Sequence, residues 1–244
     1  MVGAPAAADA IARARRLPSL HVGLHLVLID GSPVLPAHKL DGLVDRDGRF
    51  DGDPLRAGLR FFFRPGARRR LAAEIRAQFE AFRATGLALD HVNAHKHMHL
   101  HPTVARLVVE IGRDYRIRAM RLPAEPRESL SRAFPGERLP LPPPGFAVAA
   151  LRRRLRHAGL ASNDHVFGIA WSGRMTENRV LRILPFLPEG LSEIYFHPAN
   201  EPGAAPSTDR PAEELAALIS PRVRRRIEEL GIGLASYADV APGF

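Results

Sequence analysis

The chain has 244 residues, of which 45% are hydrophobic and 25% are charged, a composition typical of a soluble globular protein with one large domain. It contains no cysteine, which excludes disulfides and thiolate metal sites, so a metal would have to be bound by imidazole and carboxylate. No apolar run reaches the roughly 18 residues that a membrane span needs. The N-terminus lacks the pattern of a secretory signal, so we expect a cytoplasmic location.

The formal net charge of +9 comes almost entirely from arginine, because Lys39 and Lys96 are the only lysines. Arginine runs at 68–70, 152–154 and 224–226 could bind phosphate groups or anionic lipid headgroups. No nucleic-acid recognition motif or interleaved aromatic residues accompany these runs. We therefore expect them to form solvated helix faces, and we expect no nucleic-acid partner.

Helices and strands alternate along the first half of the chain. An amphipathic helix begins near Pro5, and the alternation from Leu20 to Leu28 is typical of a strand. Residues 36–66 are rich in Pro, Gly and Asp and predict a long loop or lid. The elements predicted next are a helix over Arg68–Thr85, a strand from Leu87 into residues 91–102, a helix over Pro102–Tyr115 and a short strand over Ile117–Leu122.

The second half repeats this alternation with shorter elements. Residues 123–145 are irregular and proline-rich, and they predict an insertion rather than a domain boundary. The remaining predicted elements are a helix over Phe146–Gly159, a strand over His165–Ala170, a helix over Thr176–Leu187, a strand over Leu191–Phe196, helices over Pro211–Leu218 and Pro221–Leu230, and a strand over Gly233–Ser236. The pattern predicts a single α/β domain of mainly parallel strands over residues 1–244.

The segment HVNAHKHMHLHP, residues 91–102, holds five of the eleven histidines. In a strand, the alternating His95, His97, His99 and His101 would project from one face, at the end where α/β folds place their sites. One strand face supplies only one or two ligands to a single ion, so a further ligand must come from elsewhere. His25 is the best candidate, although a lone histidine is more often a hydrogen-bonded residue on a partly buried face.

Two other features bear on hydrolytic chemistry. His197 ends a strand just before Pro198, a position suited to a general acid or to a residue with no role. A hydrolytic metal site also needs a carboxylate. Asp30 follows the first strand and Asp90 precedes the histidine segment, but the chain contains no Asp-Asp pair. The residues alone therefore leave the carboxylate ligand unassigned.

Five segments of the chain resemble the YdjC-like carbohydrate deacetylases, a family that includes the chito-oligosaccharide deacetylases, and most of all its hopanoid biosynthesis-associated branch. They are PSLHVGLHLVLIDGSPVLP (18–36), LDHVNAHKHMHLHP (89–102), RLP (121–123), EIYFHPAN (193–200) and LASYADV (234–240). They occur in the family's order and extend over essentially the whole chain. The resemblance implies a distorted (β/α) barrel-like fold and a divalent metal, Mg²⁺ or Zn²⁺, held by one aspartate and two histidines.

Carried over by position, the resemblance implies that His25 and His95 bind the metal and that His197 is the general acid. The implied reaction is hydrolysis of the N-acetyl group of an N-acetylglucosamine-containing substrate, either a chito-oligosaccharide or a glycosylated hopanoid lipid. A lipid substrate would require peripheral contact with a membrane, such as the inner membrane. Relatives also suggest a homodimer. The residues expected to contact the substrate are His97, Arg121 and Trp171, while Phe61–Phe63 and Trp171 could instead pack in the core.

The chain departs from this family at its start. The family opens with a strand, a TADDFG-like motif that supplies the third ligand and the base, and a helix, and this chain has no counterpart. We expect a start assigned too late at Met1, with roughly 35 residues missing. Asn93 also stands where many relatives outside the hopanoid branch carry aspartate. The alternatives are an impaired or non-catalytic fragment with a residual two-histidine metal site, and a phosphate-ester hydrolase, which the lack of a Gly-rich phosphate loop disfavours.

Overall fold

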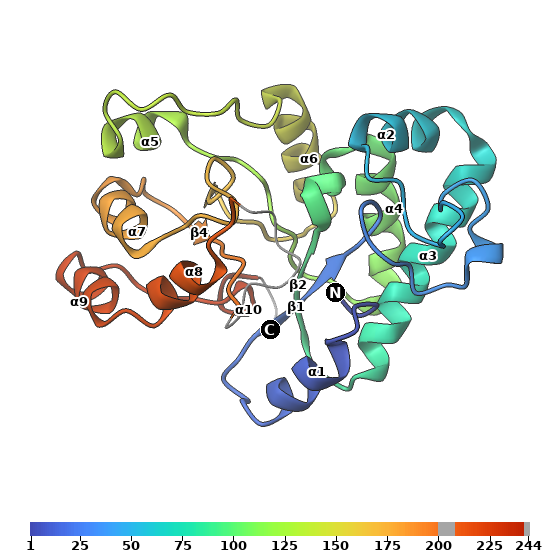
Figure 1. Cartoon of the computed structure of the whole chain (residues 1–244), viewed down its shortest axis with the longest axis horizontal. Coiled ribbons are helices and arrows are strands. Elements are labelled where there is room, and N and C mark those ends of the chain that lie inside the picture. Colours follow the sequence, from blue (N-terminus) through green and yellow to red (C-terminus); the bar gives the residue numbers. More distant parts are fainter. Residues whose placement is uncertain (200–207, 242–244) are drawn as a thin grey trace. The chain divides into compact units, whose positions relative to one another are not determined.

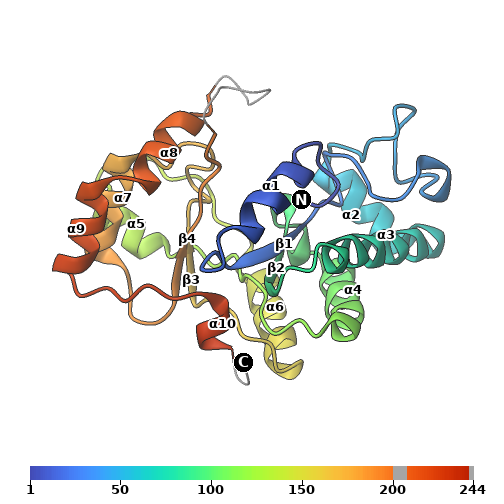
Figure 2. The same cartoon turned by 90° about the horizontal axis from the view of Figure 1, so that it is seen from below.

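The computed structural model describes residues 1–199 and 208–241, which fall into two compact units (Figures 1 and 2). Unit 1 comprises residues 1–121, residues 149–162 and the segment from Ala235 onward. Unit 2 comprises residues 122–148 and 163–234. Each unit has its own parallel strand pair and its own helices. One domain over residues 1–244 stays a prediction.

Two parallel strands form the centre of unit 1. Strand β1 (Val22–Leu26) pairs with β2 (Leu89–Ala94), and His25 lies opposite Asn93 in this register. Leu24 and Leu26 are fully buried on one face of β1, as their alternation predicts. The predicted strand over residues 117–122 is reduced to two bridges, in which Met120 pairs with Val92 and Ala119 pairs with Ala161.

Helices surround this strand pair, and α3 and α4 pack side by side (Figure 2). Leu71, Ile75 and Phe79 recur every four residues on α3 and are all buried, which explains why this segment is helical. The helices are α1 (Ala7–Arg15), α2 (Pro54–Phe63), α3 (Pro65–Ala84), α4 (Pro102–Gly112), α6 (Gly145–His157), of which residues 149–157 belong to unit 1, and α10 (Tyr237–Val240). The 3₁₀ helices are η1 (Ala37–Lys39), η2 (His95–Leu100) and η3 (Arg113–Tyr115).

The prediction of a long loop over residues 36–66 was wrong in its second half, where helix α2 forms. The carboxylate of Asp53 accepts hydrogen bonds from the backbone N–H groups of Leu55 and Arg56, at 2.9 and 3.2 Å, and Pro54 occupies the first turn. An N-cap of this kind offsets the unpaired N–H groups of a helix start. Because the surrounding residues are rich in Pro, Gly and Asp, which favour loops, the Asp-Pro start of this helix was not recognised in the sequence.

The predicted strand through the histidine segment was also wrong, because β2 ends at Ala94. The next residues form η2, in which Lys96 and His97 have left-handed backbone angles, with φ of 47° and 54°. Two consecutive left-handed residues break the extended alternation. The four alternating histidines therefore do not share one strand face.

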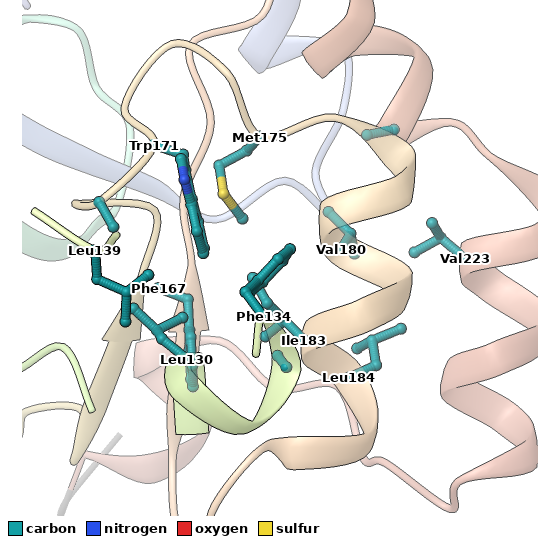
Figure 3. Packing of buried hydrophobic residues seen from close by; sticks show 13 residues of the cluster. Leu130, Phe134, Leu139, Phe167, Trp171, Met175, Val180, Ile183, Leu184 and Val223 are labelled. Atoms are coloured by element: carbon teal, nitrogen blue, oxygen red, sulfur yellow. The ribbon is translucent and has the colours of Figure 1, made fainter. Parts of the chain in front are cut away.

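Unit 2 is built around the strand pair β3 (His165–Phe167) and β4 (Ser192–Ile194), which run parallel. A buried hydrophobic cluster that includes Phe134, Phe167 and Trp171 forms its core (Figure 3). The predicted strand over residues 233–236 does not form, and this irregular segment leads directly into α10. The helices of unit 2 are α5 (Arg127–Ala133), which lies inside the predicted irregular insertion, α7 (Glu177–Ile183), η4 (Leu184–Phe186), α8 (Pro211–Leu218) and α9 (Pro221–Glu229).

The α/β class with parallel strands is confirmed, but residues 1–199 and 208–241 form no closed barrel. Each named sheet has two strands, and β3 and β4 have only 3 residues each. A barrel needs a continuous ring of paired strands, which such short and separate pairs do not provide. Among the described helices, none has the length and the apolar composition to cross a membrane.

Candidate functional site

His25 and His95 lie close together in unit 1, as the sequence predicts. His25 is near the C-terminal end of β1, and His95 follows directly after the end of β2. The two imidazole centroids are 5.7 Å apart, and the rings meet edge to face at 72°. Parallel pairing of β1 and β2 produces this proximity, because the C-terminal ends of both strands emerge at one edge. Their role as metal ligands stays a prediction.

A chain of hydrogen bonds orients His25. Nδ1 of His91 lies 2.8 Å from the carboxylate of Asp90, Nε2 of His91 lies 3.2 Å from Nδ2 of Asn93, and Oδ1 of Asn93 lies 2.5 Å from Nδ1 of His25. Burial opposes ionisation of Asp90, but hydrogen bonds from His91 and from the backbone N–H of Ala238 keep its pKa below the ordinary value. Asp90 is therefore the ionised end of this chain.

The charge on Asp90 and a neutral imidazole at His91 together give each bond in the chain a direction. A carboxylate only accepts, so Nδ1 of His91 donates to it, and in the neutral ring Nε2 of His91 is then an acceptor. The amide N–H of Asn93 then donates to His91, which leaves the amide oxygen to accept from Nδ1–H of His25. The lone pair on Nε2 of His25 is thereby left available. We call Asp90, His91, Asn93 and His25 the relay.

The protonation state of His25 suits a metal ligand. Burial lowers its pKa to about 3, although the hydrogen bond to Asn93 opposes this effect. His25 is therefore neutral near pH 7, and neutral imidazole is the form that binds metals. A second residue that orients a ligating histidine through its other nitrogen is a common feature of metal sites. The relay provides such an orientation.

Backbone and ring packing hold the relay in place. A Cβ atom on Gly23 would come within 2.5 Å of the His91 ring, so a larger residue at this position of β1 would have to displace that ring. The centroid of the Tyr237 ring lies 4.5 Å from that of the His91 ring, and Ala238 donates its backbone N–H to Asp90 at 2.9 Å. Two sequence motifs, VGLHL and LASYADV, therefore meet at His91.

Asp30 is a carboxylate close to His95, but it forms an ion pair with Lys96. Oδ2 of Asp30 lies 3.9 Å from Nε2 of His95 and forms an ion pair with the Lys96 ammonium. The hydrogen bond from Lys96 lowers the pKa of Asp30, so this residue is ionised. Across residues 1–199 and 208–241, no group of three or more His, Asp or Glu side chains is arranged to hold a metal. Two imidazoles suit a metal, but the described residues do not complete a three-ligand set.

The other histidines of the segment separate into different environments. His97 and His99 meet edge to face with centroids 6.0 Å apart, and His99 is only 1% exposed. Burial holds the pKa of His99 well below its ordinary value. His101 packs against Phe61 at 6.1 Å, and although it precedes α4, its side chain does not cap that helix. Core packing therefore accounts for His99, and His101 is a half-buried residue that packs on Phe61, while substrate contact by His97 stays a prediction.

Arg121 lies in unit 1 close to the relay. Its backbone N–H donates to the carbonyl of Val92 at 3.1 Å, which places it beside β2. After burial, the charge of Arg121 is among the smaller causes that lower the pKa of His25 and of His99. This position is compatible with the predicted substrate contact, which stays a prediction.

Two predicted site residues lie in unit 2. His197 is exposed beyond the end of β4, its backbone N–H donates to the buried Glu214, and its ring meets Tyr195 edge-on at 5.5 Å. Trp171 is 5% exposed and packs on Phe134 with centroids 4.3 Å apart (Figure 3). The burial of Trp171 argues against its predicted stacking on a sugar. Residue 200, the last of the EIYFHPAN segment, lies outside the described residues.

Sequence reasoning did not identify the relay. From the sequence, His91 was noted only as one histidine of the segment. Asn93 was noted only as a difference from relatives, and Asp90 only as a candidate carboxylate ligand. Residues 91 and 93 are two apart on β2 and therefore share a face, which was the available signal. The link to His25 depends on strand register, which the sequence does not display.

Comparisons with known proteins support one family. Residues 1–229 match the family model described as YdjC-like protein. A carbohydrate deacetylase from Geobacillus stearothermophilus is 29% identical over 247 residues, covering 98% of this chain and 84% of that protein. One from Mus musculus is 31% identical over 264 residues, covering 96% and 82%.

Two further matches differ in extent. A carbohydrate deacetylase from Brevibacillus brevis is 36% identical over 108 residues, and this alignment spans 44% of this chain and only 40% of that protein. A crystal structure of a protein from Enterococcus faecalis V583 superposes with a TM-score of 0.72, covering 99% of this chain and 86% of that one. At 21% sequence identity, this likeness shows the fold alone. On the family model and the long alignments, the chain belongs to the YdjC-like protein family.

Proposed function

We propose that this chain is a carbohydrate deacetylase that hydrolyses the N-acetyl group of an N-acetylglucosamine-containing substrate. The observation that carries the proposal is the pair of neighbouring imidazoles, of which His25 is neutral and oriented through the relay. Two relatives that bear the name carbohydrate deacetylase align with nearly the whole chain, which supports the same activity.

His25 and His95 are the residues that would hold a divalent metal. Such an ion, when bound, supplies Lewis-acid activation of a carbonyl group and of water. Imidazole donors favour Zn²⁺ over Mg²⁺, which prefers oxygen. Asp30 is paired with Lys96 and is therefore not assigned as a metal ligand, so the carboxylate that would complete the site stays unassigned.

The remaining site residues have distinct proposed tasks. The relay keeps the proton of His25 on Nδ1, so that the lone pair of Nε2 is available to bind a metal. Water adds to the acetyl carbonyl, and as the amide C–N bond breaks His197 donates a proton to the glucosamine nitrogen, which releases acetate and the free amine. His97 and Arg121 contact the sugar.

A specific observation favours a lipid-borne substrate over a soluble chito-oligosaccharide. On α2, Leu55, Leu59, Phe62 and Phe63 are between 51% and 72% exposed, whereas Phe61 is buried at 2%. An amphipathic helix normally turns its apolar side chains inward, and exposed apolar patches mark contact sites. Arg56 is exposed on the same helix and would complement anionic headgroups. We therefore include peripheral membrane contact, and a glycosylated hopanoid lipid as substrate, in the proposal.

Acetate release tests the activity. The full-length chain, supplied with Zn²⁺ or Mg²⁺, is incubated with an N-acetylglucosaminyl lipid and with a chito-oligosaccharide. We expect acetate release by the unmodified chain and none by His25→Ala or His95→Ala. His38→Ala, at an exposed histidine outside the site, should release acetate normally. Metal that binds in calorimetry without acetate release from either substrate would favour the non-catalytic alternative.

Flotation with anionic vesicles tests the membrane contact separately. The double variant Leu59→Ser, Phe63→Ser should reduce vesicle binding, while Leu141→Ser, at a residue that is 89% exposed elsewhere, should not. Unchanged flotation of the double variant would remove the membrane from the proposal and favour the oligosaccharide. A homodimer stays a prediction, as does the lack of a nucleic-acid partner.

A further inference from the structure

A pocket of about 250 Å³ in unit 2 is lined by an unusual excess of positive charge. Its charged lining consists of four arginines and two glutamates, which leaves an excess of two positive charges at neutral pH. Three of the arginines are half-buried rather than fully solvated. The charged lining residues are Arg174, Arg179, Arg182, Arg210, Glu137 and Glu213.

The two glutamates neutralise only two of the arginines. Arg182 lies 3.5 Å from Glu137, and Arg210 lies 3.0 Å from Glu213. Among the residues that the structure describes, Arg174 and Arg179 form no ion pair with a carboxylate within 4.0 Å. The excess positive charge therefore resides on this pair.

Arg174 and Arg179 are also held close to one another. Nη1 of Arg179 donates to the backbone carbonyl of Arg174 at 2.8 Å, and the Arg179 guanidinium lies over the Trp171 ring at 5.1 Å. Trp171 in turn belongs to the buried cluster with Phe134, so the ring beneath the guanidinium is packed into the hydrophobic core (Figure 3). A guanidinium seated on an aromatic face loses little further freedom when it binds a ligand.

This arrangement is electrostatically unfavourable without a ligand. Burial and the neighbouring charge of Arg174 lower the pKa of Arg179, and the charge of Glu137 opposes this only in part, so the cationic form of Arg179 is destabilised there. An anion bound in the pocket that both arginines line would remove that cost. Arginine offers paired N–H donors that match the oxygens of phosphate, and a phosphate monoester carries nearly two negative charges at pH 7.

We infer that this pocket binds a phosphate monoester through Arg174 and Arg179. The two negative charges of the ester balance the excess of the lining, and the neutral side chains of Thr176 and Asn178 face the same pocket as further hydrogen-bonding groups. The lining residues all belong to unit 2, and occupancy of the pocket does not require deacetylase activity.

Trp171 is the single tryptophan of the chain, and it reports on this pocket through its contact with Arg179, whose guanidinium lies over its ring. The full-length protein is titrated with inorganic phosphate and with glycerol 3-phosphate at constant ionic strength, and tryptophan emission is followed with calorimetry as a second measurement. We expect saturable binding of both probes. Arg174→Gln, which leaves the Trp171 contact intact, should weaken binding about tenfold or more, because a charge-assisted hydrogen bond is lost. Arg179→Gln should weaken it at least as much.

Arg225→Gln, at an exposed arginine on α9 of the same unit, is the matched control and should bind both probes normally. Sedimentation with phosphatidic acid vesicles distinguishes the source of the phosphate. Binding to the soluble probes alone indicates a free ester, and additional binding to vesicles indicates that a lipid headgroup is also accepted. Absence of binding by both methods, or equal affinities of wild type and Arg174→Gln, would overturn the inference.

Discussion

The two units use a carboxylate in opposite ways, buried Asp90 in unit 1 and half-buried Glu125 in unit 2. In unit 1, Asp90 accepts from the side chain of His91 and thereby orients a series of side chains that ends at His25. In unit 2, Glu125 accepts only backbone N–H groups, those of residues 168–170 at 2.9–3.0 Å. The first carboxylate sets the donor and acceptor pattern of a candidate site, whereas the second stabilises a turn of the chain. Hydrogen bonding by a carboxylate therefore points to a functional role here only where its partners lead to a reactive group, as they do for Asp90.

The largest expected effect comes from Asp90→Ala. The loss of a buried, charge-assisted acceptor should destabilise the protein by about 3 kcal/mol, because Nδ1–H of His91 and the backbone N–H of Ala238 lose their partner. Loss of the orienting charge should also weaken Zn²⁺ binding about 10- to 100-fold. Urea unfolding and calorimetric titration measure the two quantities.

Glu125→Ala is the matched change in unit 2 that sharpens this comparison. It should destabilise the protein by a similar amount, about 3 kcal/mol, because three backbone N–H groups lose their acceptor. It should leave Zn²⁺ affinity unchanged. Equal losses of Zn²⁺ affinity in both variants would show that Asp90 acts through general stability rather than through the relay.

Gly23→Ala should have an intermediate effect. The added Cβ would meet the His91 ring within 2.5 Å, and overpacking of this kind costs about 1–3 kcal/mol. The displaced ring should also move the NMR signals of the His25 imidazole. Gly233→Ala is the control, since its Cβ would meet no atom within 4 Å. A neutral Gly23→Ala variant would mean that the His91 ring is free to move aside.

The smallest effect concerns pH. Burial lowers the pKa of His99, so the folded state keeps this ring neutral while the unfolded state takes up a proton. Stability from this group is complete above the unfolded pKa of about 6.5 and falls as pH decreases, by at most about 1.4 kcal/mol per pH unit. His99→Leu should flatten the decline between pH 7 and pH 5 in urea unfolding, whereas His157→Leu, at an exposed site, should not. Parallel pH profiles of wild type and His99→Leu would contradict the assignment.

Local patterns predicted the regular elements where packing and periodicity agree. The alternation around Leu24 and the four-residue spacing of Leu71 and Ile75 both matched the observed strand and helix, because each pattern creates one apolar face. The strand prediction failed at Lys96 and His97, whose left-handed angles have no sequence signal, since neither is glycine. In the structure, the left-handed turn at Lys96 and His97 is accompanied by a tertiary contact, the ion pair between Lys96 and Asp30.

Sequence by itself determined the family segments, the alternation of helices and strands, and the identity of the two histidines that the structure brings together. Tertiary structure alone decided which side chains orient His25 and which arginines lack an acidic partner. The reason is physical: His25 and Asn93 are 68 residues apart, and they meet only because the packing of the intervening helices sets one register between two parallel strands. A one-residue change of that register would turn Asn93 away from His25.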